Sequence, residues 1–229
     1  MLNADFHVHT ILSKHHFLDR IKLADGLNTP AEMVKGAADS GLNCIAITDH
    51  NVLFDPELAK KLTKEYGIVV LAGIELYLNK KDVIAIGITE LPKVNNLSEF
   101  EEEVHKQGGL LIAPHPNDPL GRGYKEFECF DAIEVVNGFG PWGFEELVAT
   151  ADRLKKAQIC GSDAHCIRQL GWTFCMVDAD PDPDSIIEAI KERKSTPVYG
   201  KIPKDVQYLY YFQKYMLGQA LFKPALRRL

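Results

Sequence analysis

The sequence predicts an α/β domain in which short buried strands alternate with amphipathic helices. Two observations support this prediction: short apolar runs recur along the chain, and most of them are followed by a helical pattern with its own start and stop signals. Such alternation implies parallel strands joined by helical crossovers. With this many units within 229 residues, a closed or nearly closed barrel competes with an open doubly wound sheet.

The boundaries of the elements follow from apolar runs and capping residues. Thr29 before Pro30 is typical of a helix start, and Ser98 has a glutamate in capping-box register. Strands are expected at residues 2–6, 43–47, 68–72, 82–88, 110–113, 132–136, 158–160, 173–177 and 197–199. Helices are expected at residues 30–40, 56–66, 98–107, 141–157 and 184–194.

The composition disfavours several classes of function. The net charge of −6 gives no basic field for nucleic acid or an anionic membrane. No apolar run approaches a membrane span, and no glycine-rich dinucleotide or phosphate loop follows a strand. The five cysteines are scattered, and the first residues lack the basic-then-apolar pattern of a signal peptide. We therefore expect a cytoplasmic protein with reduced thiols and no membrane span.

Polar residues of metal-binding type follow nearly every expected strand. They are His7 and His9, Asp49 and His50, Glu75, His115, Asn137, and Asp163 with His165. The carboxyl ends of parallel barrel strands share one rim, where barrel active sites are built. Each residue alone has an ordinary alternative, such as a helix cap, a solvated acid or a turn histidine. Their joint placement predicts a shared polynuclear metal site, because imidazole nitrogens and carboxylate oxygens bind borderline divalent metals and Glu75 can bridge two of them.

Five ordered motifs resemble those of the PHP (polymerase and histidinol phosphatase) superfamily over about residues 1–200. They are Asp5-Phe6-His7-Val8-His9-Thr10, Ile47-Thr48-Asp49-His50-Asn51, Gly73-Ile74-Glu75, Ala113-Pro114-His115-Pro116 and Gly161-Ser162-Asp163-Ala164-His165. The resemblance implies a distorted seven-stranded (β/α) barrel of the TIM type with a metal cluster at the carboxyl rim of the strands. It also implies two or three divalent ions, with Zn, Mn or Fe as the candidates.

The resemblance further implies how the ligands are shared between the ions. His7, His9, Glu75 and Asp163 would hold one metal, Glu75 and His115 would contribute to a second, and His50 and His165 to a third.

The sequence departs from the family pattern at two positions. Members usually have an aspartate in a Ser-Asp context after the first motif, whereas Ser13 is followed by Lys14. They often have a histidine on the strand after the bridging glutamate, where this chain has Ile84. We therefore expect a complete first site, a second site short of one ligand, and a third without its aspartate. Either Lys14 holds a substrate phosphate there, or it points to solvent and His15 or His16 replaces the lost ligand.

Other candidates for chemistry lie beside the motifs. Arg122 and Arg168 could hold a phosphate, because the guanidinium fork matches phosphate oxygens; a solvated loop charge is the alternative for Arg122. Asp49 could orient a ligand histidine rather than bind metal itself. His50 or His165 would be the general acid if the third metal is absent.

The chain is expected to divide into a barrel at residues 1–203 and an aromatic-rich helical tail at residues 204–229. The tail would pack across the barrel as a helix, with a homo-oligomer contact and a membrane-surface helix as alternatives.

Together these observations predict a metal-dependent phosphoesterase, either a phosphatase or a phosphodiesterase. Its substrate would be a phosphate ester of a small metabolite or nucleotide, attacked by a metal-activated water. One alternative is a degenerate PHP-type protein that binds metal without catalysis, in a structural or ligand-sensing role. A second alternative is a metallohydrolase of C–N or C–O bonds that uses the same rim.

Overall fold

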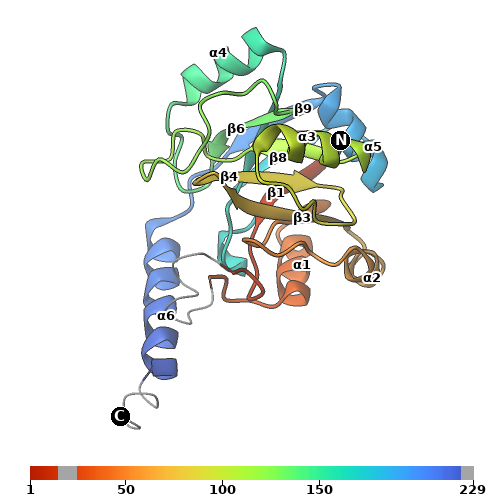
Figure 1. Cartoon of the computed structure of the whole chain (residues 1–229). Coiled ribbons are helices and arrows are strands. Elements are labelled where there is room, and N and C mark those ends of the chain that lie inside the picture. Colours follow the sequence, from red (N-terminus) through yellow and green to blue (C-terminus); the bar gives the residue numbers. More distant parts are fainter. Residues whose placement is uncertain (15–24, 223–229) are drawn as a thin grey trace.

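The computed structural model of the chain describes residues 1–14 and 25–222, and its centre is a nearly closed sheet (Figure 1). The strand order is β7-β6-β5-β4-β3-β2-β1-β8-β9. The strands are β1 (Leu2–Val8), β2 (Cys44–Ile47), β3 (Val69–Leu78), β4 (Lys81–Ile86), β5 (Leu110–Ala113), β6 (Ala132–Asn137), β7 (Ala157–Gly161), β8 (Thr173–Val177) and β9 (Ser195–Tyr199). The helices are α1 (Pro30–Asp39), α2 (Pro56–Tyr66), α3 (Leu97–Lys106), α4 (Phe144–Leu154), α5 (Pro183–Lys191) and α6 (Lys204–Phe222), with a short 3-10 helix, η2 (Ile167–Gln169).

The sheet curls so that its two ends meet. Strand β7 packs against β1, β8 and β9, and the loop after β7 bridges to β1 through the pair Val8 and Ala164. The barrel type agrees with the expectation from sequence. The sheet has nine strands rather than seven, because β8 and β9 continue it beyond β1 in antiparallel pairs.

The strands are not all parallel, although alternation with helices predicts parallel strands. Strand β4 is antiparallel to both β3 and β5, because the turn at Asn79 and Lys80 folds β3 and β4 into a hairpin. Both turn residues have positive φ, as tight hairpin turns require. This reversal brings the start of β4 to the rim where the other strands end.

Both faces of the central strands are buried, which explains their continuous apolar sequences. In β2, Cys44 and Ala46 face the larger core with α3, α4 and α5, whereas Ile45 and Ile47 face a second core with α1 and α2. This alternation leaves only the rim for polar side chains.

The helix ends follow sequence signals, with one correction. Thr29 caps α1 in a complete capping box with Glu32, as expected. Helix α3 is capped by Asn96 through the backbone amide of Glu99, so the expectation that Ser98 caps it is wrong. Asn96 is itself a strong capping residue, and it starts the helix earlier.

Helix α6 forms a long column along one side of the molecule, separate from the helices that cover the sheet (Figure 1). Its backbone stays helical through Gly218. Tyr210 is buried, whereas Tyr208 and Phe212 are largely exposed. Within the described ranges, no helix combines the length and apolar character needed to cross a membrane.

The capping box of α1 gives a test of local stability. Replacing Thr29 by Ala removes the acceptor for the Glu32 amide, and we expect the free energy of unfolding to fall by about 1 kcal/mol. Urea denaturation of metal-depleted protein measures this change. Thr29→Ser is the control and keeps the cap, so equal midpoints for Thr29→Ala and Thr29→Ser would contradict the assignment.

Candidate metal centre

Four side chains from the end of β1, from β3 and from the loop after β7 converge on one region of the rim. His7 Nε2 lies 3.3 Å from Glu75 Oε2 and 3.6 Å from Asp163 Oδ1. His9 Nε2 lies 3.3 Å and 3.2 Å from the same two oxygens. All four side chains are buried or nearly so. The alternation of side chains along β1 places both imidazoles on one face, as the His-x-His pattern predicts.

These spacings fit a metal ion. In a tetrahedral site with bonds of about 2.0–2.1 Å, neighbouring ligand atoms lie about 3.3–3.4 Å apart. In the part of the chain that is described, neither ring nitrogen of His9 has a partner with hydrogen-bond geometry. A buried imidazole without a hydrogen bond is costly, and a bound cation would satisfy it. The donor set therefore fits a divalent metal.

Glu75 on β3 is placed to bridge ions. Its Oε2 lies 3.1 Å from His50 Nδ1 as well as near His7 and His9, while its Oε1 lies 3.0 Å from His115 Nε2. Burial alone would raise the pKa of Glu75, but the charges of His50 and His7 hold it well below the usual range. Glu75 is therefore ionised and shared between neighbouring groups of ligands.

Asp82 joins the second group of ligands, beside Glu75 and His115. Its Oδ2 lies 3.9 Å from His115 Nε2, and Asp82 can share a metal with Glu75 and His50. Burial and the charge of Glu75 raise the pKa of Asp82 to about 7. Ile84 is buried beside Glu75 at the position where family members often carry histidine. Asp82 lies two residues before Ile84, on the same face of β4. The sequence pattern did not indicate Asp82, because only residues that follow a strand were expected at the rim.

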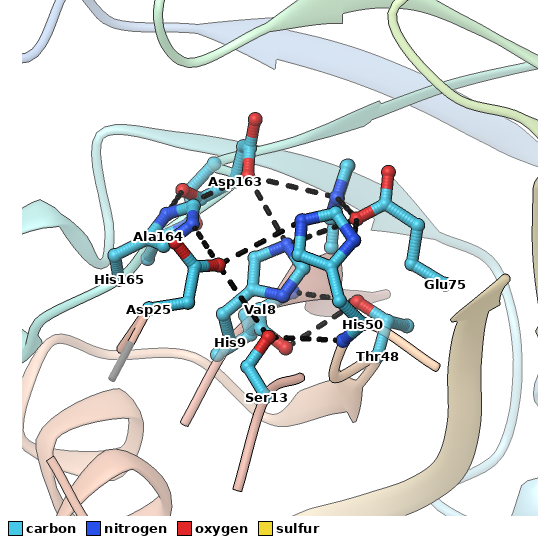
Figure 2. A network of polar contacts seen from close by, with 12 residues as sticks. Val8, His9, Ser13, Asp25, Thr48, His50, Glu75, Asp163, Ala164 and His165 are labelled. Carbon is cyan, nitrogen blue, oxygen red and sulfur yellow. Dashed lines mark hydrogen bonds and ion pairs between the residues drawn. The ribbon is translucent and has the colours of Figure 1, made fainter. Parts of the chain in front are cut away.

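Asp25 completes the third group of ligands. Its Oδ2 lies 2.9 Å from His165 Nε2 and 3.7 Å from His50 Nε2, and the three form a cluster with His9 (Figure 2). Ser13 Oγ donates to the same oxygen at 3.4 Å and accepts a hydrogen bond from the His50 amide. The expectation that the third site lacks its aspartate is therefore wrong.

Ser13 and Asp25 are in contact in the structure, but they are not adjacent in the sequence. Residues 14–24 lie between Ser13 and Asp25, so the position directly after Ser13 is occupied by Lys14. The residue after Asp25 is Gly26, where a Cβ atom would lie 2.4 Å from the carbonyl oxygen of Thr10. The sequence signal that could have identified Asp25 is the Asp-Gly pair ahead of the Thr29-Pro30 helix start.

Three further acids, all buried, hold the ligands in place. Glu134 on β6 lies 3.1 Å from His7 Nδ1, which favours a hydrogen on Nδ1 and leaves Nε2 for a metal. Asp5 accepts hydrogen bonds from the amides of His7 and Ser162, and burial raises its pKa to about 7. Asp49 accepts hydrogen bonds from the amide and hydroxyl of Thr10 at 2.5 and 2.7 Å. Glu134 was missed because a single acid within a buried strand has no motif.

Two ligands sit in strained backbone. His115 has a φ of 29° and Asp163 a φ of 53°, in the region that favours glycine. Asn137 Nδ2 donates to both Glu134 and Asp163, and Glu134 also accepts from the His115 amide, so β6 connects the two strained segments. Such strain persists where the surroundings fix the conformation, and it is concentrated at functional sites.

The ligands open onto a cavity of about 470 Å³. Arg122 lines it and donates through Nε to Asp118 at 2.9 Å. Lys214 of α6 lines it near Asp25. Arg168 lines a separate groove beside α6, and Lys14 is exposed with its amide bonded to the His50 carbonyl. The residues His15 and His16, predicted as replacement ligands, lie outside the described ranges.

Comparisons with known proteins agree with this architecture. The PHP domain family model matches residues 5–120, and a PHP-associated model matches residues 147–195. An uncharacterised protein of Methanocaldococcus jannaschii is 33% identical over 159 residues, which cover 68% of this chain and 93% of that protein.

Solved structures share the fold at lower identity. A two-domain protein of Bacteroides vulgatus, which contains a predicted PHP-like metal-dependent phosphoesterase, has a TM-score of 0.65 and 21% identity over 87% of this chain. A lesion-specific endonuclease of Pyrococcus furiosus has a TM-score of 0.61 and 18% identity over 83% of this chain. The matches span 65% and 56% of those two chains, respectively. The family models and the archaeal relative together show that this chain belongs to the PHP domain family.

Proposed function

We propose that this chain is a metal-dependent phosphoesterase that hydrolyses a phosphate ester of a small metabolite or nucleotide. The observation that supports this proposal most strongly is the set of three ligand groups along one cavity, the first two of which share Glu75. A phosphoryl group in this cavity would face the ligand row and the cations Arg122 and Lys214 together. The acidic balance of the chain favours a small substrate over a long nucleic acid.

The residues present would hold two or three divalent ions, with Zn, Mn or Fe as the candidates. By their contacts, the first group is His7, His9, Glu75 and Asp163. The second is Glu75, His115 and Asp82. The third is Asp25, His50 and His165. When bound, such ions would withdraw charge from phosphoryl oxygens and lower the pKa of a nearby water.

The other residues orient, bind and transfer protons. Arg122 would bind a phosphoryl oxygen with guanidinium hydrogens that its Nε contact with Asp118 does not use. Asp49 is a positioning residue, because it fixes the Thr10 loop beside the ligands. Hydrolysis cleaves the bond between phosphorus and the leaving oxygen, which then needs a proton. His50 or His165 would supply it if the third group holds no ion.

A non-catalytic role has less support than catalysis. The sequence favoured it through Lys14 and Ile84, which stand where the family has ligands. Asp25 and Asp82 supply carboxylates in the same two groups. The cavity also gives a substrate access to them, which a purely structural metal site does not need.

We also propose an oligomeric contact and a cellular location for the protein. The exposed Tyr208, Tyr211 and Phe212 on α6 support a homo-oligomer contact through the tail at residues 204–229, beyond a barrel at residues 1–203. All five cysteines are free, which supports a cytoplasmic location.

Metal content tests the third group. Asp25→Asn keeps the size of the side chain but removes its charge, so we expect the variant to hold one divalent ion fewer per chain than the parent. Mass spectrometry of desalted protein loaded with Mn²⁺ or Zn²⁺ measures this. Asp39→Asn, at an exposed position on α1, is the matched control. Unchanged metal content in Asp25→Asn would exclude Asp25 as a ligand.

Metal affinity is expected to increase with pH. Burial opposes the charged form of His9, but the nearby carboxylates of Asp163 and Glu75 raise its pKa to about 10. His9 is therefore protonated at pH 7 in the metal-free protein, and an ion must displace that proton. The association constant then rises by up to tenfold per pH unit for each displaced proton.

Calorimetry of Zn²⁺ binding in PIPES and in Tris counts the released protons, because the two buffers differ in ionisation enthalpy. His105→Gln, on the exposed surface of α3, should release the same number as the parent. Identical heats in the two buffers would show that no proton leaves.

Catalysis is tested directly with p-nitrophenyl phosphate and bis-p-nitrophenyl phosphate in the presence of Mn²⁺. We expect turnover of at least one ester. In His7→Ala, kcat/KM should fall by about 10³-fold or more, because His7 belongs to the first ligand group and contacts the shared carboxylate of Glu75. No turnover by the parent, with His7→Ala equally inert, would favour the non-catalytic alternative.

A further inference from the structure

Helix α6 contributes a cation to the ligand cavity from outside the barrel. Lys214 Nζ donates to Asp25 Oδ1 at 2.8 Å and to the Tyr210 hydroxyl at 2.9 Å. Tyr210 is buried, packs beside the His165 ring at 5.5 Å, and donates to the Asp25 carbonyl at 3.2 Å. These contacts fix the ammonium at the edge of the third ligand group.

The two oxygens of Asp25 serve different partners. Oδ2 faces His165 and His50, as a metal ligand must, while Oδ1 faces Lys214. The lysine therefore has no need to leave when the third group is occupied. It would lie next to any phosphoryl group held against that group.

The ammonium has a donor left for a ligand. It carries three hydrogens, and its acceptors among the described residues are Asp25 Oδ1 and the Tyr210 hydroxyl. Its side chain is 19% exposed and lines the same cavity as Glu75 and His115. The third hydrogen is thus available to an oxygen in the cavity.

The second cation of the cavity lies at the other end of the ligand row and has more carboxylate neighbours. Arg122 Nε lies 2.9 Å from Asp118 and 3.7 Å from Asp82, on the side of His115. Two cations at opposite ends of the row suit a group that carries more than one negative charge. A phosphate monoester is dianionic with three non-bridging oxygens, whereas a diester is monoanionic with two.

We propose that Lys214 binds a non-bridging oxygen of a terminal phosphoryl group and gives this site a preference for phosphate monoesters over diesters. This inference rests on the proposed phosphoesterase function. Lys214 is a substrate-binding residue, and Tyr210 is a positioning residue that holds it. A purely structural role, in which Lys214 only neutralises Asp25, predicts different results in the experiment below.

The test uses the full chain with Lys214→Met, Lys214→Arg and the control Lys201→Met, which removes an exposed lysine before α6. In Lys214→Met, KM for p-nitrophenyl phosphate should rise roughly tenfold or more, because a charge-assisted hydrogen bond is lost. KM for bis-p-nitrophenyl phosphate should change much less. Lys214→Arg should restore most of the monoester affinity, and metal content should match the parent in all variants.

Binding of inorganic phosphate to the metal-loaded protein gives a readout that is independent of turnover. Calorimetry should show weaker binding in Lys214→Met and parent-like binding in Lys201→Met. Equal phosphate affinity in Lys214→Met and the parent, equal loss for both esters, or loss of metal would overturn the proposal. If the parent hydrolyses neither ester, the proposed function fails, and the phosphate measurement alone decides whether Lys214 is an anion-binding residue.

Discussion

The shared carboxylate of Glu75 is the constraint on which the rest of the site depends. One buried side chain must face His7, His9 and His50 through one oxygen and His115 through the other. An ionised group in the interior is tolerated only when it is paired with cations or metals. The strand ends that contribute these four imidazoles are therefore held at fixed distances from β3. The curl of the sheet, which brings β7 against β1, lets distant strands meet this requirement.

Much of the fold and of the site could be predicted from sequence, because each is written in local patterns. Buried strands have continuous apolar runs, and the histidines follow them directly. Asp82 and Asp25 could not be placed in this way. Asp82 begins a strand whose direction is reversed, and strand direction depends on pairing across the sheet. Asp25 lies 12 positions after Ser13 in the sequence, and no residue spacing encodes the contact between their side chains.

The contribution of α6 was equally hidden from sequence. Its aromatic residues predict burial or an interface, and Tyr210 is indeed buried while Tyr211 is exposed. The sequence does not indicate that Lys214 contacts Asp25, because the two residues are 189 positions apart. Their contact joins α6 to the segment just before α1. Burial alone would raise the pKa of Asp25, but the charges of His165, His50 and Lys214 hold it well below its usual range.

The charges of the site also explain why its ligands would accept metal readily. Without an ion, the carboxylates Glu75 and Asp163 are balanced by protons on His7 and His9, whose pKa values are raised against the opposing effect of burial. A divalent cation would replace those protons with charge at the centre of the cluster, where each imidazole Nε2 already lies 3.2–3.6 Å from an oxygen of both carboxylates. The protonated cluster is thus preorganised for metal, since binding exchanges one kind of positive charge for another with little movement of the chain.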